Sequence, residues 1–303
     1  MKNFTGKVAV ITGGGSGIGK ALAMAAAKRG MKLALLDIQS DALAQSVDEL
    51  RQMGAEAVGI TADVSDAAAM QTVADQIEIH YGAIHLVFNN AGVTSSGPVW
   101  ESTEKDWDWL LGINLKGVVN GVRSFTPKML AAASDKAYEG CVVNTASLAG
   151  ILAGPGMGIY SVSKHAVVAL SECLHYDLQL VSPQVRAAVL CPSYVPTAIG
   201  NSDRNRPAHL LNEKPPTNAQ LASLAAAQQA VAQGNITATE VAEITFKAIE
   251  QGCFYIFPSP EGLALFKLRS DNILNQVTPE FPYELFPAMK DRRDRMLAAQ
   301  AKT

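Results

Sequence analysis

Short apolar runs alternate with longer amphipathic stretches along most of the chain, from Lys7 to about Pro260. Each run is nearly continuous in hydrophobic residues and lacks the polar residue at every second position of a half-exposed strand. Such runs are typical of parallel strands in a sheet whose two faces are both covered by helices. The predicted strands are 8–12, 32–37, 56–61, 86–89, 141–145, 187–191 and 254–257.

The stretches between these strands have helical periodicity, and several begin with recognisable helix-start signals. Ser65-Asp66 opens one stretch, and Thr103 followed by Asp106 three residues later resembles a capping box. The predicted helices are 18–29, 40–53, 66–81, 104–132, 160–180 and 239–251. Strands and helices that alternate in this way predict an α/β fold, a doubly wound Rossmann fold with a seven-stranded parallel sheet flanked by helices.

Two segments do not follow this alternation. The stretch at about 193–236 contains four prolines and then an Ala/Gln-rich helix at about 220–232, and we interpret it as a lid insertion. A helical C-terminal extension at about 259–303 carries two predicted helices, 261–276 and 287–301. Because the sequence shows no internal repeat and no linker, we expect a single Rossmann-type domain over 1–303 with its core at 5–258.

Charge and hydropathy exclude several classes of protein. The 303 residues include 25 Lys and Arg against 28 Asp and Glu, which makes the formal net charge −3. A nucleic-acid-binding protein would usually show a basic excess, and disorder requires low hydrophobicity, whereas 48% of this chain is hydrophobic. No apolar run reaches the roughly 20 residues of a membrane span. We therefore expect neither a nucleic-acid partner nor a membrane partner.

Cysteine and histidine spacing indicates neither a disulfide framework nor a metal site. Cys141, Cys173, Cys191 and Cys253 all lie in apolar stretches, which predicts buried free thiols and a reducing, cytoplasmic environment. The histidines have no metal-ligand spacing with one another or with the cysteines, so no bound metal is expected.

The first predicted strand runs directly into a glycine-rich turn that a helix follows. Glycine permits a sharp turn and a close approach to a pyrophosphate, and the helix N-terminus offers free N–H groups to that anion. An ordinary glycine-rich turn is the alternative, which the strand before and the helix after make less attractive. The cofactor-binding residues predicted here are Gly13, Gly15, Ser16, Gly17, Ile18 and Gly19.

The ends of the following strands supply further candidates for the same dinucleotide. Asp37 closes the second strand, where a carboxylate can accept hydrogen bonds from both hydroxyls of an adenosine ribose and repels a 2′-phosphate. No Lys or Arg lies nearby to bind that phosphate, so NAD is favoured over NADP as the cofactor. The alternative is that Asp37 merely caps the next helix. Further predicted contacts at these strand ends are Ile38, Asp63, Val64, Asn90, Ala91 and Gly92.

A second group of polar residues indicates acid–base chemistry. Tyr160 and Lys164 lie four apart at the start of a predicted helix and so share one face, while Ser147 follows the fifth strand. A free phenol is a poor base near neutral pH, with a pKa of about 10, and a neighbouring ammonium lowers that pKa. Such a tyrosine can exchange a proton with an alcohol oxygen while a hydride moves to or from a nicotinamide.

Together these motifs resemble the short-chain dehydrogenase/reductase family over about residues 5–258. The matching positions are Thr12-Gly13-x-x-x-Gly17-x-Gly19, Asp37, Asp63, Asn89-Asn90-Ala91-Gly92, Asn114, Ser147, Tyr160-x-x-x-Lys164 and Thr197. The resemblance implies that Tyr160 is the general acid/base, that Lys164 holds the nicotinamide ribose and lowers the tyrosine pKa, and that Ser147 orients the substrate oxygen. It also implies that Asn114 holds a water linking Lys164 to solvent. Cofactor contacts at Pro192, Val195 and Thr197 complete the implied set.

The chain departs from the family pattern at one position and points to a subgroup at others. The family usually has Pro-Gly after the sixth strand, where this chain has Pro192-Ser193, and the added Cβ could narrow the pocket. The segments at 114–122 and 255–261, with the long C-terminal extension, are loosely similar to the NAD-linked subgroup that oxidises benzylic alcohols of lignin-derived aryl ethers.

The segment from Ser147 to Tyr160 carries no charge and no side-chain amide, which predicts an apolar substrate pocket. We therefore expect a bulky, mostly apolar secondary alcohol or its ketone, aromatic or alicyclic, as the small-molecule substrate. The predicted substrate-binding residues are Ser147, Ala149, Leu152, Tyr160 and Tyr194. Cationic lid residues, Arg204, Arg206, His209 and Lys214, could bind a substrate carboxylate, although a solvated loop surface is the commoner explanation.

Three functional interpretations follow from these residues. The first is an NAD-dependent alcohol dehydrogenase or ketone reductase, and the second is a non-catalytic NAD-binding redox sensor or scaffold. The third, a nucleotide-sugar epimerase or dehydratase, ranks low because those enzymes have a different glycine spacing. Helices at 104–132 and 160–180 commonly form subunit contacts in proteins of this kind, so we expect a homo-oligomer, either a dimer or a tetramer.

Overall fold

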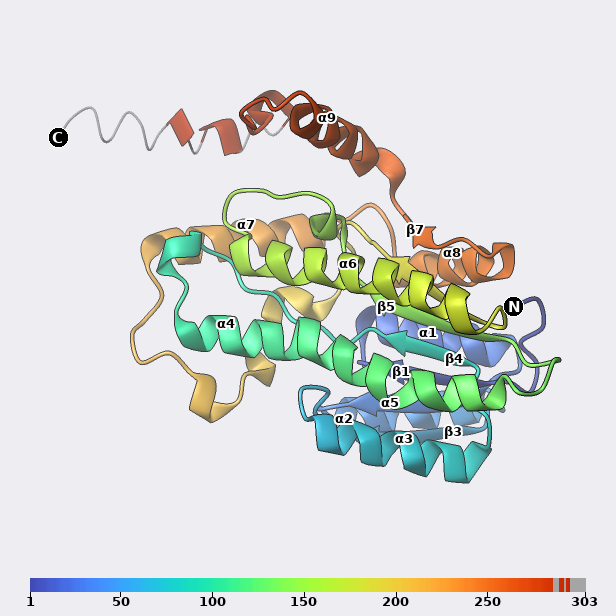
Figure 1. Ribbon diagram of the computed structural model, residues 1–303. Helices are drawn as coiled ribbons and strands as arrows, with labels where there is room; N and C mark the ends of the chain where they lie inside the picture. Colours follow the sequence, from blue (N-terminus) through green and yellow to red (C-terminus); the bar gives the residue numbers. More distant parts are fainter. Residues whose placement is uncertain (286–288, 292, 295–303) are drawn as a thin grey trace. The chain divides into compact units, whose positions relative to one another are not determined.

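The computed structural model describes residues 1–285, 289–291 and 293–294, and within them it contains one seven-stranded parallel sheet (Figure 1). The strand order is β3-β2-β1-β4-β5-β6-β7, which confirms the predicted doubly wound fold. The strands are β1 (Val8–Thr12), β2 (Lys32–Asp37), β3 (Ala57–Thr61), β4 (Leu86–Asn89), β5 (Gly140–Thr145), β6 (Val185–Leu190) and β7 (Tyr255–Ile256). β7 is shorter than predicted because it is an edge strand that pairs with β6 through only two residues.

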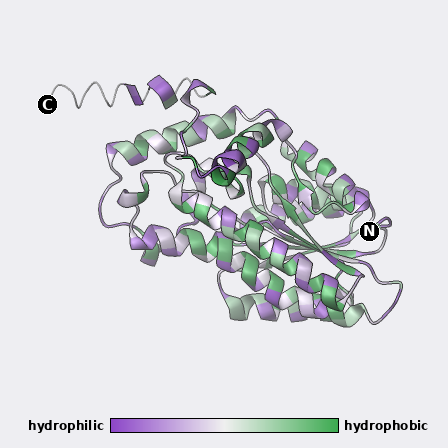
Figure 2. Ribbon diagram, turned by 45° about the horizontal axis from the view of Figure 1, so that its top comes forward, coloured by the Kyte–Doolittle hydropathy of each residue, from purple (hydrophilic) through white to green (hydrophobic). Residues whose placement is uncertain are grey.

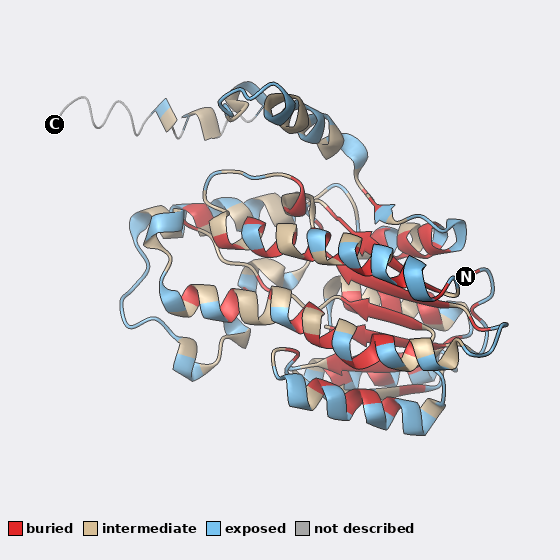
Figure 3. Ribbon diagram, in the orientation of Figure 1, coloured by how far each residue is buried: buried red, intermediate tan, exposed pale blue. Residues whose placement is uncertain are grey.

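Helices cover both faces of this sheet. One hydrophobic core lies between the sheet and the helices α1, α2 and α8, and a second lies against α3, α5 and α6. The helices are α1 (Gly17–Lys28), α2 (Ser40–Gln52), α3 (Ala67–Tyr81), α4 (Glu104–Leu111), α5 (Gly117–Ala132), α6 (Gly158–Val181), α7 (Asn218–Ala232) and α8 (Ala238–Gln251). Because helices pack on both faces, the central strands β1, β4 and β5 are buried along their whole length, whereas the edge strands β3 and β7 are partly exposed (Figures 2 and 3).

The predicted single helix at 104–132 is interrupted, which corrects the sequence-based prediction. A π-helical turn, η2 (Gly112–Lys116), separates α4 from α5 and contains Asn114. Periodicity could not reveal this turn, because apolar spacing continues through it. A π-turn inserts one extra residue per turn and so can redirect a side chain, and such turns are frequent at functional sites.

The strand order places a crevice at one edge of the sheet. Chain connections run outward in one direction from β1 to β3 and in the other direction from β4 to β7. The chain therefore continues from β1 and from β4 into helices on opposite faces of the sheet. The crevice between the carboxyl ends of these two strands is where doubly wound sheets bind their ligands. Thr12 and Asn89 end these two strands, and Asp37 and Thr145 end their neighbours on either side.

The lid insertion contains two 3₁₀ segments, η4 (Ala198–Asn205) and η5 (Ala208–Leu210), followed by α7. Thr217 and Gln220 form a capping box that starts α7, so this helix begins two residues earlier than predicted. α7 packs on loops that carry glycine, since a Cβ added at Gly97 would lie 2.8 Å from Gln220 and one at Gly156 would lie 3.1 Å from Ser223. Larger side chains in these loops would push the lid helix away.

The chain divides into two compact units, residues 1–262 and residues 263–303. The second unit contains α9 (Leu263–Leu274) and the short η7 (Tyr283–Leu285). The predicted helix at 287–301 lies for the most part outside the described residues, and the domain limits expected from the sequence remain a prediction. Among the described residues, no helix combines the length and apolar character needed to cross a membrane.

All four cysteines are free thiols, but the prediction that all four are buried is wrong. Cys141 and Cys191 are buried in strand β5 and directly after β6, whereas Cys173 and Cys253 are exposed. Cys173 lies on the outer face of α6, where an apolar neighbourhood in sequence does not imply burial. Within the described residues, no group of three or more His, Cys, Asp and Glu side chains is placed to hold a metal ion.

Candidate active site

The glycine-rich turn after β1 folds tightly against the end of β4. The hydroxyl of Thr12 accepts hydrogen bonds from the backbone N–H groups of Asn90 and Ala91 at 2.8 and 3.0 Å. Gly13 has a φ of +67°, and a Cβ there would lie 3.0 Å from Ala91 Cα. A Cβ at Gly19 would lie only 2.0 Å from the carbonyl oxygen of Gly13. The turn therefore requires glycine both for its backbone conformation and for the contact between α1 and β1.

Asp37 holds the glycine-rich turn from the end of β2. One oxygen of its carboxylate accepts a hydrogen bond from the N–H of Gly15 at 2.9 Å, and the other accepts one from the N–H of Gln39 at 3.0 Å. The N-cap of α2 is Gln39, so Asp37 is not the capping residue that the alternative interpretation required. Its side chain lies instead between the turn and the start of α2, beside the exposed Ile38.

The segment that follows the third strand is held by its own polar contacts. Asp63 is exposed, and its carboxylate accepts hydrogen bonds from the backbone and hydroxyl of Ser65 at 2.8 and 2.7 Å. The carbonyl of Val64 accepts one from the side chain of Asn120 at 2.8 Å. Asn120 was not predicted as a site residue, although a polar residue on the inner face of an otherwise apolar helix is a usable signal.

Asn114, Lys164 and Gly92 come together at the centre of the crevice. Asn114 is fully buried, and its side-chain amide pairs with both the N–H and the carbonyl of Val93, at 2.9 and 3.0 Å. A Cβ at Gly92 would lie 3.3 Å from Asn114 Oδ1 and 3.6 Å from Lys164 Nζ. The π-turn η2 thus aims Asn114 into the space that Gly92 leaves open, next to the lysine.

Tyr160 and Lys164 share one face of α6, as the sequence predicts. The ammonium of Lys164 donates a hydrogen bond to the carbonyl of Thr145 at 2.9 Å and lies 5.7 Å from the ring centroid of Tyr160. Burial lowers the pKa of Lys164 to about 8. Burial raises the pKa of Tyr160 to about 12, and the hydroxyl of Ser147 acts in the opposite direction. Desolvation is the largest influence on the pKa of Tyr160, so this pKa is raised, and not lowered as the sequence led us to expect from the lysine.

Ser147 lies between the catalytic tyrosine candidate and the loop after β6. Its hydroxyl donates a hydrogen bond to the carbonyl of Pro192 at 3.3 Å and accepts one from the N–H of Ala149 at 3.1 Å. Thr197, at the start of the lid, lies next to the glycine-rich turn, because a Cβ added at Gly17 would lie 3.3 Å from the methyl group of Thr197. The lid therefore reaches from the tyrosine to the glycine-rich turn.

The remaining predicted site residues lie around this crevice and differ in their exposure to solvent. Pro192 and Val195 are buried, Ser16 is exposed as the N-cap of α1, and Ile18 is half-buried in its first turn. Among the predicted substrate residues, Ala149 and Leu152 are half-buried and Tyr194 is exposed. Tyr194 is close enough to Tyr160 that its phenol contributes to the raised pKa of the latter.

A buried polar chain behind the site was missed in the sequence. Asn89 donates a hydrogen bond to Asn144 at 2.9 Å, and Asn144 donates one to Ser171 at 3.0 Å, so β4, β5 and α6 are linked inside the core. Asparagine in the last two residues of each of two adjacent buried strands is the signal that could have identified it. Such a network holds α6, and therefore Tyr160 and Lys164, in register with the sheet.

The comparisons with known proteins agree with this geometry. A family model described as short chain dehydrogenase matches residues 7–208. The chain therefore belongs to the short-chain dehydrogenase family of oxidoreductases.

Similar proteins extend the match to nearly the whole chain. The CLA biosynthesis dehydrogenase/reductase of Lactiplantibacillus plantarum is 34% identical over 283 residues, which cover 92% of this chain and 97% of that protein. The C alpha-dehydrogenase of Sphingobium sp. is 33% identical over 286 residues, covering 92% of this chain and 89% of that protein. A short-chain dehydrogenase/reductase from Burkholderia phymatum, solved in complex with NAD, is 48% identical with a TM-score of 0.91, over 93% of this chain and 99% of that one.

The low pKa of Lys164 leads to a prediction about stability. The folded protein releases this proton near pH 8 and the unfolded chain near pH 10.5, so the unfolded state binds more protons between these values. Stability attributable to this group therefore rises with pH across that window. At pH 7 both states are protonated, and burying the charge costs about 3 kcal/mol. Lys164→Met should accordingly be the more stable protein at pH 7, by up to about 3 kcal/mol, with the difference shrinking toward pH 10.

Urea unfolding of both proteins at pH 7 and pH 9.5 would measure this difference. The exposed Lys116 provides a matched control, because Lys116→Met removes the same group without relieving any burial. A Lys164→Met variant that is less stable than wild type by the same amount at both pH values would contradict the prediction.

Proposed function

We propose that the protein is an NAD-dependent oxidoreductase that interconverts a bulky, mostly apolar secondary alcohol and its ketone. The observation that carries this proposal is the group of four polar residues beside the carboxyl ends of β4 and β5, in which Asn114 and Lys164 are buried and Tyr160 and Ser147 are half-buried. A non-catalytic NAD-binding protein would have no use for a lysine buried at an energetic cost beside a desolvated phenol. The redox-sensor alternative is therefore not favoured.

The residues at the carboxyl end of β1 fit NAD. Gly13, Gly19 and Gly92 lie where an added Cβ would come close to backbone atoms or polar side chains. These glycines therefore form a cradle in which the backbone stays accessible to the cofactor. Asp37 would accept hydrogen bonds from the adenosine ribose and disfavour a 2′-phosphate, which supports NAD over NADP. When bound, NAD supplies the acceptor or donor of the hydride. The relative from Burkholderia phymatum was solved with NAD, which supports the same choice.

The residues of the chain would then handle the proton. Tyr160 exchanges it with the substrate oxygen, Ser147 holds that oxygen in place, and Lys164 supplies positive charge beside the phenol. Because burial raises the pKa of Tyr160 to about 12, the phenol is protonated near neutral pH and suited to protonating a ketone oxygen during reduction. Alcohol oxidation requires the phenol to accept a proton and is expected to be favoured at alkaline pH.

The wall beside Tyr160 supports an apolar substrate. The segment 148–159 carries no charge, and Ile159 packs with Val93, Trp109 and Leu110 in a buried apolar cluster. The lid cations do not change this interpretation, because Arg204 donates hydrogen bonds to the carbonyls of Ala198 and Asn201 in its own turn. The relative named C alpha-dehydrogenase is consistent with a benzylic alcohol.

Steady-state kinetics on a panel of substrates would test the proposal. We expect kcat/KM for a benzylic or alicyclic secondary alcohol to exceed that for lactate or a sugar alcohol by at least about tenfold, because desolvated apolar contacts favour the bulkier substrate. Turnover with NAD should exceed turnover with NADP. A preference for small charged hydroxy acids or for sugars would contradict the proposed substrate class.

We also propose that the protein works as a homo-oligomer in the cytoplasm, as expected from the sequence. The supporting observation is a row of exposed apolar side chains on α6, which are Val162, Tyr176, Leu180 and Val181. Exposed apolar side chains that follow one helix face often mark contacts between subunits.

A further inference from the structure

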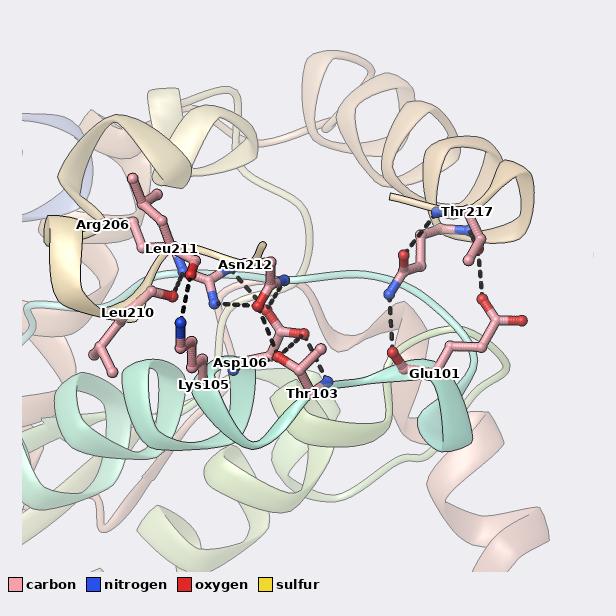
Figure 4. A network of polar contacts seen from close by, with 10 residues as sticks. Glu101, Thr103, Lys105, Asp106, Arg206, Leu210, Leu211, Asn212 and Thr217 are labelled. Atoms are coloured by element: carbon pink, nitrogen blue, oxygen red, sulfur yellow. Dashed lines mark hydrogen bonds and ion pairs between the residues drawn. The ribbon is translucent and has the colours of Figure 1, made fainter. Parts of the chain in front are cut away.

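A buried ion pair fastens the lid to α4, and the sequence predicted a structural role for only one partner, Asp106, as part of a capping box. Arg206 in the lid lies 2.7 Å from the carboxylate of Asp106, and the two side chains are only 8% and 9% exposed (Figure 4). Asp106 is also the third residue of α4 and completes a capping box with Thr103. The prediction that Arg206 either binds a substrate carboxylate or faces solvent is therefore not supported, because its charge is already neutralised inside the protein.

The carboxylate of Asp106 is fully committed to holding the lid and the helix start. One oxygen accepts hydrogen bonds from Arg206 and from Asn212 at 2.9 Å, and the other accepts them from the backbone and hydroxyl of Thr103 (Figure 4). Although burial raises the pKa of Asp106, the hydrogen bonds from Thr103, Asn212 and Arg206 together hold it below its ordinary value. The carboxylate is therefore charged at neutral pH, and the pair is an ionic anchor.

Arg206 also shapes the lid segment that follows it. Its Nε donates a hydrogen bond to the carbonyl of Leu210 at 2.8 Å, and its guanidinium lies 5.0 Å from the ring centroid of Trp109. Trp109 is buried, and Leu210 and Tyr160 both pack against the cluster that it forms with Val93 and its neighbours. The guanidinium thus bridges α4 and the turn that carries Leu210 to the surroundings of Tyr160.

Several other contacts between the lid and this region are exposed, whereas the hydrogen bonds from Asn212 to Asp106 and from Gln220 to the carbonyl of Glu101 are partly buried. Thr217 donates a hydrogen bond to the carboxylate of Glu101 at 2.5 Å, and Lys105 donates one to the carbonyl of Leu211 at 3.1 Å (Figure 4). Exposed polar contacts contribute little because water competes for them, whereas breaking a buried charge pair leaves the remaining charge uncompensated. The Arg206–Asp106 pair is therefore the charged contact expected to contribute most to holding the segment 206–212, together with the hydrogen bond from Asn212 to the same carboxylate.

We propose that Arg206 is a positioning residue for substrate selection, which rests on the proposed function. By pairing with Asp106 it holds Leu210 against the apolar cluster beside Tyr160, and Leu210 then completes the wall that a bulky apolar alcohol contacts. Because the guanidinium is already paired, Arg206 itself presents no free charge to a substrate carboxylate. Arg206 takes no part in the proton transfer, so its loss acts on binding of large substrates and spares the chemical step.

Two variants and one matched control test this role. Arg206→Met breaks the anchor, and Leu210→Ala removes the wall while leaving the ion pair intact. Arg29→Met is the control, because Arg29 also pairs with a carboxylate, that of Glu243 at 2.8 Å, and lies 4.5 Å from the ring centroid of Phe246. That arrangement joins α1 and α8, away from the lid.

Steady-state kinetics with a bulky benzylic alcohol and with propan-2-ol provide the first readout. In Arg206→Met and in Leu210→Ala we expect KM for the bulky alcohol to rise about tenfold, with kcat and KM for propan-2-ol changed less than about threefold. Arg29→Met should lower the melting temperature without this split. Equal losses for both alcohols, or the same split in Arg29→Met, would overturn the proposal.

Hydrogen exchange of the lid separates this proposal from the proposed function. Arg206→Met should speed amide exchange at 206–212, whereas Arg29→Met should leave it unchanged. Absence of any alcohol turnover by the wild-type protein would refute the proposed function and leave this readout intact. Unchanged exchange at 206–212 in Arg206→Met would refute the anchor itself, and faster exchange without the KM split would refute its role in selection.

Discussion

Replacing Tyr160 with phenylalanine is expected to lower kcat by about three orders of magnitude, while NAD binding persists. General acid–base catalysis by a positioned side chain contributes about 10²–10⁴-fold, and the substitution removes only the hydroxyl that exchanges the proton. The ring remains to fill its place beside the cluster of Val93 and Trp109. The loss of activity should therefore appear in kcat, and the melting temperature should stay close to that of the wild type.

The measurement combines steady-state kinetics with a titration of NAD. Tyr81→Phe is a matched control, because it likewise removes a tyrosine hydroxyl that is engaged in a hydrogen bond, to the carbonyl of Leu33 at 3.1 Å, but lies at the end of α3. Its turnover should match the wild type. Undiminished turnover in Tyr160→Phe would remove the assigned role and revive the redox-sensor interpretation, whereas lost NAD binding would point to a structural defect.

An alanine at Gly19 is expected to destabilise the protein and to abolish most of its affinity for NAD. The new Cβ would lie 2.0 Å from the carbonyl oxygen of Gly13, a backbone atom that cannot rotate away, so α1 would have to move from the end of β1. Overpacking of this kind costs about 3 kcal/mol. For a domain of this size we expect the melting temperature to fall by roughly 10 °C. A displaced turn should weaken NAD binding about a hundredfold.

Gly112→Ala is the matched control for this substitution. Gly112 also has a helical conformation, but a Cβ there would meet only Ser65, at 3.8 Å. Alanine is the better helix former by about 1 kcal/mol, so this variant should be as stable as the wild type or slightly more stable. Thermal unfolding and calorimetric titration with NAD would measure both variants. A Gly19→Ala protein with wild-type stability and affinity would show that the turn tolerates the displacement.

The site residues whose relative positions the sequence could predict are those that depend on short-range spacing. Tyr160 and Lys164 share a helix face because they are four apart, and the glycine-rich turn follows a strand and precedes a helix. The doubly wound parallel sheet could be inferred because continuous apolar runs separated by helices permit few other topologies. Long-range pairing was less accessible, and the pKa values of Tyr160 and Lys164 depend on burial that spacing does not reveal.

The sequence by itself therefore determined the fold class, the cofactor end of the sheet and the group at Ser147, Tyr160 and Lys164, because periodicity and local motifs encode them. Only the tertiary structure decided three other matters. It placed Asn114 in a π-turn, showed that Asp37 holds the glycine-rich turn, and paired Arg206 with Asp106. Each of these depends on which atoms meet when distant segments pack, and for Arg206 the partner lies 100 residues earlier in the chain.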